Sequence, residues 1–117
     1  MNYYEKNISE LRKHDPALAS KIDSVKDSGR LKAEKSKTDQ PTLKVNDIYL
    51  HSKYDPEKEG DTWAESFDIE QDKPICVFGF GMGYHVKSLL KRVDAQVYII
   101  EPSLEILKCA LEHIDFA

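Results

Sequence analysis

The sequence lacks the features that define several classes of protein. No apolar run approaches the roughly 18 residues that a membrane-spanning helix requires, so we expect no membrane contact. The first residues are neither basic nor apolar in the manner of a secretory signal, and we expect none. Nucleic-acid binding requires a basic surface, whereas 17 lysines and arginines stand against 21 aspartates and glutamates, a net charge of −4. We therefore expect no nucleic-acid partner.

Cysteine is also scarce, with two residues in the whole chain. Cys76 and Cys109 both occupy positions of an apolar pattern, the first in a predicted strand and the second in a predicted helix. Such positions favour reduced, buried thiols over a disulfide or a metal pair, so we predict no metal site. Reduced thiols are typical of a cytoplasmic protein, and we expect that location.

The length of 117 residues fits one domain with a modest core. We divide it into three parts: a helical and loop lead-in at residues 1–40, a hairpin plus a helix at residues 41–73, and a Rossmann-like half at residues 74–117. We interpret residues 1–117 as a single N-terminal domain that forms part of a longer protein.

The lead-in predicts two short helices. Asn2 and Glu5, three residues apart, form a capping pair for the first helix. Asp15, followed directly by a proline, begins the second helix as its N-cap, and Gly29 suits the end of that helix. Residues 30–40 are rich in lysine and small polar residues, a pattern that fits either an edge strand or a solvated loop. We favour the loop.

Residues 42–52 predict a β-hairpin. Apolar and polar residues alternate on both sides of Asn46 and Asp47, which supply a two-residue turn. With that turn, four apolar side chains share one face of the hairpin: Leu43, Val45, Ile48 and Leu50. The agreement between the turn length and the pattern supports the hairpin, while the type of turn stays open.

A helix is predicted to follow the hairpin. Asp55, again followed by a proline, is its N-cap, and the helix extends to about Phe67. Gly60 lies inside this helix, where glycine costs roughly 1 kcal/mol relative to alanine. A short polar connector at residues 68–73 then leads to the C-terminal section.

The C-terminal section gives the strongest signal in the chain. Its segments are an apolar run, a glycine-rich turn, a helix, a second apolar run that ends in an acid, and a final helix: residues 75–78, 79–83, 86–93, 97–101 and 104–114. Continuous apolar runs are typical of parallel strands covered on both faces, and this order is that of a right-handed β-α-β crossover. We therefore predict an α/β fold, in which N-terminal helices and a β-hairpin precede an incomplete Rossmann-like βαβα unit.

The glycine-rich turn is a candidate binding site. Gly79, Gly81 and Gly83 lead into a helix whose first amides suit an anion. Glu101 stands where Rossmann proteins hold a ribose hydroxyl. Tyr84 occupies the place of the third glycine of the dinucleotide pattern, so the G-x-G-x-G spacing is closer to the first motif of S-adenosylmethionine-dependent methyltransferases. We predict that the three glycines and Glu101 bind a cofactor of unknown identity; the alternative, that they only permit a tight junction in an empty scaffold, stays open.

No catalytic residue can be identified from the sequence. His85 lies beside the glycine turn, and His51 and Tyr54 lie before the helix that Asp55 begins. No nucleophile, base and orienting group stand at a recognisable spacing. We expect His51, Tyr54 and Asp55 to tie the hairpin to this helix rather than to perform chemistry.

Four strings in the sequence point to a known family: PTLKV at residues 41–45, LHSKYDP at 50–56, FGFGMGYH at 78–85 and IEP at 100–102. Together they resemble the N-terminal region of the bacterial motility accessory factor family over residues 8–117. The resemblance implies that the parent protein transfers an activated nonulosonic, sialic-acid-like sugar to serine or threonine of flagellin. In that family the transferase chemistry is assigned to a central domain that follows this region.

The resemblance implies an accessory domain of a flagellin glycosyltransferase that is not catalytic by itself, with flagellin and the rest of the parent chain as partners. Two alternatives stay open: a binding module of the methyltransferase type, which would hold S-adenosylmethionine or a nucleotide, and a pure protein-interaction domain. Two parallel strands alone leave edges and apolar faces uncovered, so we also expect a homo-oligomer.

Overall fold

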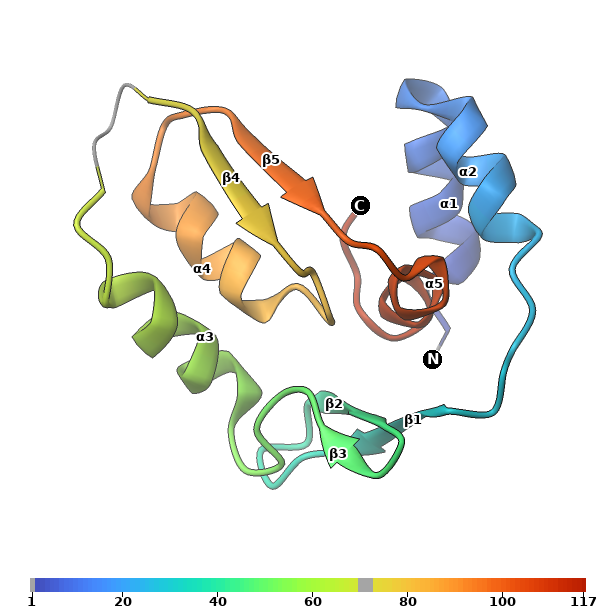
Figure 1. Ribbon diagram of the computed structural model, residues 1–117, viewed down its shortest axis with the longest axis horizontal. Helices are drawn as coiled ribbons and strands as arrows, with labels where there is room; N and C mark the ends of the chain where they lie inside the picture. Colours follow the sequence, from blue (N-terminus) through green and yellow to red (C-terminus); the bar gives the residue numbers. More distant parts are fainter. Residues whose placement is uncertain (1, 70–72) are drawn as a thin grey trace.

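The computed structural model describes residues 2–69 and 73–117, and within these it has five helices and five strands (Figure 1). The elements are, in order, α1 (Tyr4–His14), α2 (Pro16–Asp23), β1 (Leu31–Lys35), β2 (Pro41–Val45), β3 (Ile48–Tyr49), α3 (Pro56–Glu65), β4 (Ile75–Phe78), α4 (Tyr84–Arg92), β5 (Val97–Ile100) and α5 (Leu104–His113). One sheet is antiparallel in the order β1-β2-β3, and β4 and β5 form a parallel pair. The predicted α/β class with a partial Rossmann-like unit is confirmed. The predicted connector at 68–73 includes residues 70–72, which lie outside the described residues.

The two N-terminal helices begin at local capping groups. Tyr3 is the N-cap of α1, and the side chain of Asn2 instead accepts a hydrogen bond from the N–H of Tyr4 (2.8 Å). The predicted capping pair of Asn2 and Glu5 is therefore wrong, because the helix begins one residue later than that pair requires. The predicted cap Asp15 is confirmed at the start of α2, where its carboxylate accepts a hydrogen bond from a backbone N–H of the first turn (3.0 Å).

The end of α2 differs from the prediction. The helix ends at Asp23 with Ser24 as its C-cap, before the predicted stop at Gly29. The hydroxyl of Ser24 donates a hydrogen bond to the carbonyl of Lys21 (2.9 Å) and so satisfies a carbonyl of the last turn. Gly29 has a left-handed φ of 80° but lies in the loop that leads to β1. A serine side chain, rather than a glycine, therefore ends this helix.

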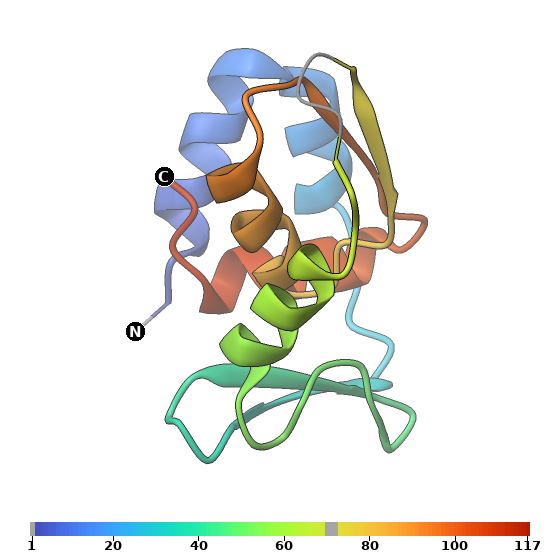
Figure 2. The ribbon, with the colours of Figure 1, turned by 90° about the vertical axis from the view of Figure 1, so that its left-hand side faces the viewer.

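Helices α1 and α2 pack against α5 at the opposite end of the chain (Figures 1 and 2). A small apolar cluster holds them together: Ile8, Ala19, Ile22 and Leu111. Asn7 lies beside this cluster and is 3% exposed. Its amide nitrogen donates to the carbonyls of Leu111 (2.8 Å) and Ile114 (2.6 Å), and its oxygen accepts from the N–H of Phe116 (2.9 Å). One buried side chain therefore joins α1 to the end of α5.

Part of the lysine-rich stretch at residues 30–40, which we predict as a solvated loop, forms strand β1. This strand pairs antiparallel with β2, with Leu31 opposite Val45. Leu31 and Ala33 pack against the hydrophobic core, whereas Lys32 between them faces solvent. The prediction of a loop is wrong because this alternation buries one face of the strand.

The predicted hairpin of β2 and β3 is confirmed. Asn46 and Asp47 have φ angles of 50° and 66°, the left-handed pair of a type I′ turn, and Val45 lies opposite Ile48. The predicted apolar face is buried only in part. Leu43 is fully buried, whereas Ile48 is 73% exposed in an edge strand that no described element covers.

Helix α3 begins as predicted and ends earlier. Asp55 accepts a hydrogen bond from the N–H of Lys58 (3.0 Å), so its role as the N-cap is confirmed. The helix ends at Glu65 rather than near Phe67. The ring of Phe67 still packs against Trp63, with 4.8 Å between the ring centroids.

Gly60 permits a close approach of α3 to α4. A Cβ atom at this position would lie 2.8 Å from the carbonyl carbon of Tyr84 and 2.9 Å from the backbone nitrogen of His85. Both atoms belong to the first turn of α4, and backbone atoms within a helix cannot move aside independently. Glycine therefore serves packing here, at a position where its helix propensity alone is unfavourable.

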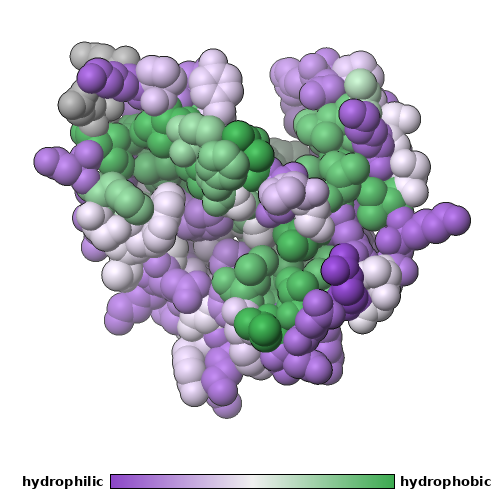
Figure 3. Space-filling view, in the orientation of Figure 1, coloured by the Kyte–Doolittle hydropathy of each residue, from purple (hydrophilic) through white to green (hydrophobic). Residues whose placement is uncertain are grey.

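The parallel pair β4 and β5 is covered on one face only. Helix α4 packs against the face on which Val77 is buried. The opposite face is open: Phe78 is 79% exposed, Tyr98 is 57% exposed, and Cys76 also lies there. Figure 2 shows α4 on one side of the strands, and Figure 3 shows hydrophobic surface over the open side. The predictions that both faces are covered and that Cys76 is buried are therefore wrong, because strand alternation turns Cys76 away from α4; the burial of Cys109 is confirmed.

Candidate functional site

The glycine turn that joins β4 to α4 has the backbone conformation that its sequence predicts. Gly79, Gly81 and Gly83 have φ angles of 89°, 54° and 81°, all in the left-handed region. A side chain at Gly81 would also overlap the imidazole of His51. The turn is therefore fixed both by its own dihedral angles and by a residue from the segment between β3 and α3.

Glu101 binds the glycine turn from the end of β5. Its Oε1 accepts hydrogen bonds from the N–H groups of Phe80 (2.9 Å) and Gly81 (3.2 Å). Its Oε2 accepts from the N–H of Ser103 (2.9 Å), which is the N-cap of α5. A carboxylate has about four lone-pair positions, so these three donors leave it room for one more. The predicted site residue therefore meets the glycine turn, and it supplies the negative charge to which the amides of the turn point.

His51 holds the next amide of the turn. Its Nε2 accepts a hydrogen bond from the N–H of Met82 (2.9 Å), so in the neutral ring the proton is on Nδ1. The Nδ1 atom lies 3.8 Å from Oε1 of Glu59, which is beyond hydrogen-bond distance. Burial and, to a lesser extent, the nearby His85 lower the pKa of His51 to about 4. His51 is therefore neutral near pH 7.

His85 faces the same region from the start of α4. Its Nε2 lies 2.9 Å from the carbonyl oxygen of Gly79, and since a carbonyl only accepts, Nε2 is the donor. The ring of His85 is nearly perpendicular to that of Trp63, with 5.1 Å between centroids, and lies 6.1 Å from the ring of His51. The two histidines and the tryptophan form one group of rings.

A pocket of about 580 Å³ opens at the carboxyl ends of β4 and β5, next to this group of rings. Of the predicted site residues, Gly79, Gly81 and Glu101 line it, and Gly83 does not. Gly83 instead lies behind the turn, where an added Cβ would be 2.8 Å from the ring of Phe80. The pocket therefore forms at the place in an open α/β sheet where ligands bind.

The sequence does not reveal the other residues that line this pocket. Glu59 and Trp63 line it from α3, one turn apart, and the hairpin segment adds His51. Nothing in the spacing of α3 separates Glu59 from the other acids of that helix. Covariation between positions of α3 and of the glycine turn among related sequences would identify them, and a single sequence contains no covariation.

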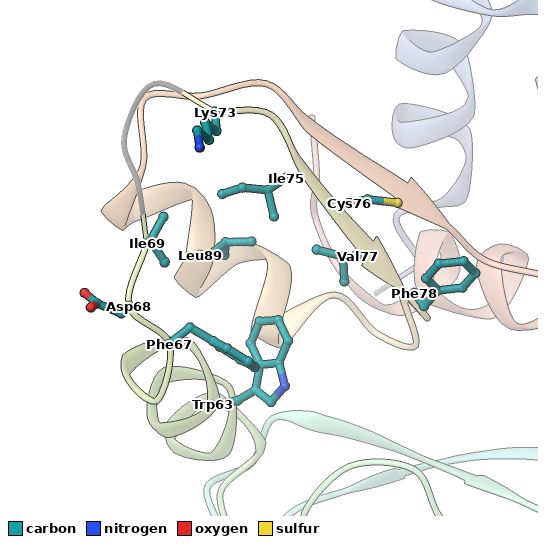
Figure 4. A pocket seen from close by; sticks show the side chains of 10 residues that line it. All are labelled: Trp63, Phe67, Asp68, Ile69, Lys73, Ile75, Cys76, Val77, Phe78 and Leu89. Atoms are coloured by element: carbon teal, nitrogen blue, oxygen red, sulfur yellow. The ribbon is translucent and has the colours of Figure 1, made fainter.

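A second hollow of about 470 Å³ lies beside β4, between that strand and α3 (Figure 4). Trp63, Phe67 and Ile69 line one side, and Val77 and Leu89 line the other (Figure 4). Its lining is mixed, since Asp68, Lys73 and Cys76 lie among these apolar residues.

The buried thiol of Cys109 is not activated. Its Sγ lies 3.7 Å from Nδ1 of His113, one turn later in α5. That nitrogen also lies 2.9 Å from the carbonyl oxygen of Cys109. Burial raises the pKa of the Cys109 thiol to about 11, so it stays protonated at neutral pH. Within residues 2–69 and 73–117, no group of three or more histidine, cysteine, aspartate or glutamate side chains could hold a metal ion.

The fold and the site define the chain as an α/β domain with a Rossmann-like half and a pocket at the ends of its parallel strands. A family model described as the glycosyltransferase Maf N-terminal domain matches residues 30–117, and the chain belongs to this family. The match begins just before β1 and includes the whole pocket. Comparisons with curated proteins and with solved structures found no match. In the described part of the chain, no helix has both the length and the apolar character needed to cross a membrane.

Proposed function

We propose that this chain is the N-terminal accessory domain of a glycosyltransferase that adds a nonulosonic, sialic-acid-like sugar to serine or threonine of flagellin. The observation that carries the proposal is the family match over residues 30–117, since that family is one of glycosyltransferases. The resemblance of the strings at 50–56 and 78–85 to motility accessory factors supports flagellin as the acceptor. Flagellin and the rest of the parent chain are the partners that we propose.

The chemistry of the described side chains supports a role without catalysis. His51 is neutral and uses its Nε2 to hold the N–H of Met82, so this nitrogen is not free to act as a base. The thiol of Cys109 is protonated and buried. The two cysteines are unbridged, which supports the cytoplasmic location that we also propose.

The test uses purified flagellin and a nonulosonic sugar activated as its CMP ester, with the mass of flagellin as the readout. The chain alone is expected to leave that mass unchanged. A glycosyltransferase of the same family, deprived of its own N-terminal region and fused to this chain, is expected to add the sugar faster than the truncated enzyme does.

Two results would contradict the proposal. Sugar transfer by the chain alone would show that it is catalytic. A fusion that is no faster than the truncated enzyme would show that the chain has no accessory role.

A further inference from the structure

We propose that the pocket at the ends of β4 and β5 binds a nucleoside that carries no phosphate and has zero or positive net charge. The proposal concerns binding by this chain and does not rest on sugar transfer. The volume of the pocket, about 580 Å³, falls within the range of about 300–1,000 Å³ that is typical of small-molecule sites.

The amides of the glycine turn already have acceptors, and this argues against a phosphate. The N–H groups of Phe80 and Gly81 bind Glu101, and that of Met82 binds His51. The N–H groups of Gly79 and Gly83 bind backbone carbonyls, at 2.8 Å each. A glycine turn that holds a phosphate offers such amides to its ligand. Here a phosphate would have to displace the carboxylate of Glu101, which serves the same donors from within the chain.

The charge of the lining argues in the same direction. The described residues that line the pocket include the carboxylates of Glu59 and Glu101 and neither a lysine nor an arginine. Glu101 accepts hydrogen bonds from three amides, whereas Glu59, with a side chain that is 50% exposed, accepts one, from the N–H of Ser52. An anionic ligand would therefore meet repulsion without a compensating cation.

The polar groups that remain are those that a nucleoside can use. His51 lines the pocket and is 8% exposed, and its Nδ1–H has no hydrogen-bond acceptor among the described residues. Glu101 keeps one position for a ribose hydroxyl, and Glu59 can accept another. Trp63 and Pro102 add apolar surface on which a flat base can stack. The lining thus offers apolar surface for a base and polar groups for a sugar.

The test is isothermal titration calorimetry of the 117-residue chain with matched pairs of probes. Adenosine is compared with AMP, cytidine with CMP, and S-adenosylmethionine tests the effect of added positive charge. At least one nucleoside is expected to bind about tenfold more tightly than its own monophosphate, the effect of about one like-charge contact near the surface. A monophosphate that binds as tightly as its nucleoside overturns the proposal, and so does the absence of binding by all three phosphate-free probes.

A charge-neutral variant separates the pocket from a non-specific effect. Glu59→Gln keeps an acceptor for the N–H of Ser52, which Oε1 of Glu59 binds at 3.0 Å, and removes the negative charge. The Glu59→Gln variant is expected to have more similar affinities for AMP and adenosine and to bind S-adenosylmethionine more weakly. Glu65→Gln also removes one negative charge from α3, but outside the pocket lining, and is expected to leave the affinities for all three ligands unchanged. Equal effects of the two variants would overturn the assignment of Glu59 to the site.

Discussion

His51 connects the acid stability of the fold to the glycine turn. Its pKa in the folded chain is about 4, below its ordinary value of 6.5, because burial disfavours the charged ring and His85 adds to this effect. The unfolded chain therefore takes up the proton first as the pH falls. The stability that the neutral ring contributes is complete above pH 6.5 and is lost as the pH falls toward 4.

We predict a loss of about 3 kcal/mol in the free energy of unfolding over this interval, measured by urea denaturation at several pH values. A His51→Gln variant keeps an acceptor for the N–H of Met82 and should have a flatter pH profile. Parallel profiles for the two proteins would show that another group controls the acid response. The carboxylates of Glu59 and Glu101, which line the same pocket, are present in both proteins, so a difference between the two pH profiles is due to His51.

Asn7 contributes more to stability than an asparagine in a surface helix does. Asn7→Ala would leave three backbone groups without their partner, two of them in buried bonds, and we expect a loss of about 2–4 kcal/mol in the free energy of unfolding. The matched control is Asn2→Ala, which removes one hydrogen bond at an exposed position. Similar melting temperatures for the two variants would contradict the role that we assign to Asn7.

Single residues show where sequence reasoning stops. The cap roles of Asp15 and Asp55 were predictable because each bond closes within three residues of its own helix start. His51 lies 31 residues from the N–H whose hydrogen bond it accepts, and Asn7 lies over 100 residues from the carbonyls to which its amide donates. Such pairs depend on how the elements pack, which the local pattern does not contain.

Gly60 tests how closely two elements can approach. In an isolated helix, Gly60→Ala would stabilise by about 1 kcal/mol. In this fold the added Cβ would meet the backbone of α4 at 2.8–2.9 Å, so we expect a net loss of about 1–3 kcal/mol. Thermal unfolding of the variant against the parent gives the sign directly. A gain in melting temperature would mean that α3 and α4 separate at little cost.

The elements of the C-terminal half were predictable because each has one strong periodic pattern and a cap or glycine at its boundary. Strand β1 was not, since its apolar residues Leu31 and Ala33 are few among lysines. A strand of that composition forms only when β2 is present to pair with it and a core to cover one face.

At the scale of the whole molecule, we expect the open face of β4 and β5 to favour self-association. Phe78 and Tyr98 expose apolar surface there, and in a solution of this chain alone only a second copy can cover it. We predict an apparent mass above 13.4 kDa that rises with concentration, measured by light scattering. A mass that stays at that of the monomer at all concentrations would contradict the prediction.

A pair of substitutions ties this association to the sheet. Tyr98→Lys places a charge on the open face and should shift the protein toward the monomer. Tyr54→Lys makes the same change at 58% exposure, against 57% for Tyr98, but in the segment before α3. Only the first variant should reduce the apparent mass.

The open face also marks what the pattern of a strand cannot reveal. Continuous apolar runs correctly predicted parallel pairing, yet Val77 and Phe78 look equivalent in the sequence and differ completely in burial. Which face of a parallel sheet is covered depends on the side to which the crossover helix returns, and α4 covers only one.

The contact of α1 and α2 with α5 has a consequence for how the molecule could be divided. The family match begins at residue 30, yet the two helices before it share a core cluster and the bonds of Asn7 with the last helix. The link between the two parts is the single loop at residues 24–30. A cut in this loop would therefore produce a split protein, composed of a helical peptide and a larger fragment. Each fragment would expose its side of the shared apolar cluster, and mixing the two should restore the fold by complementation.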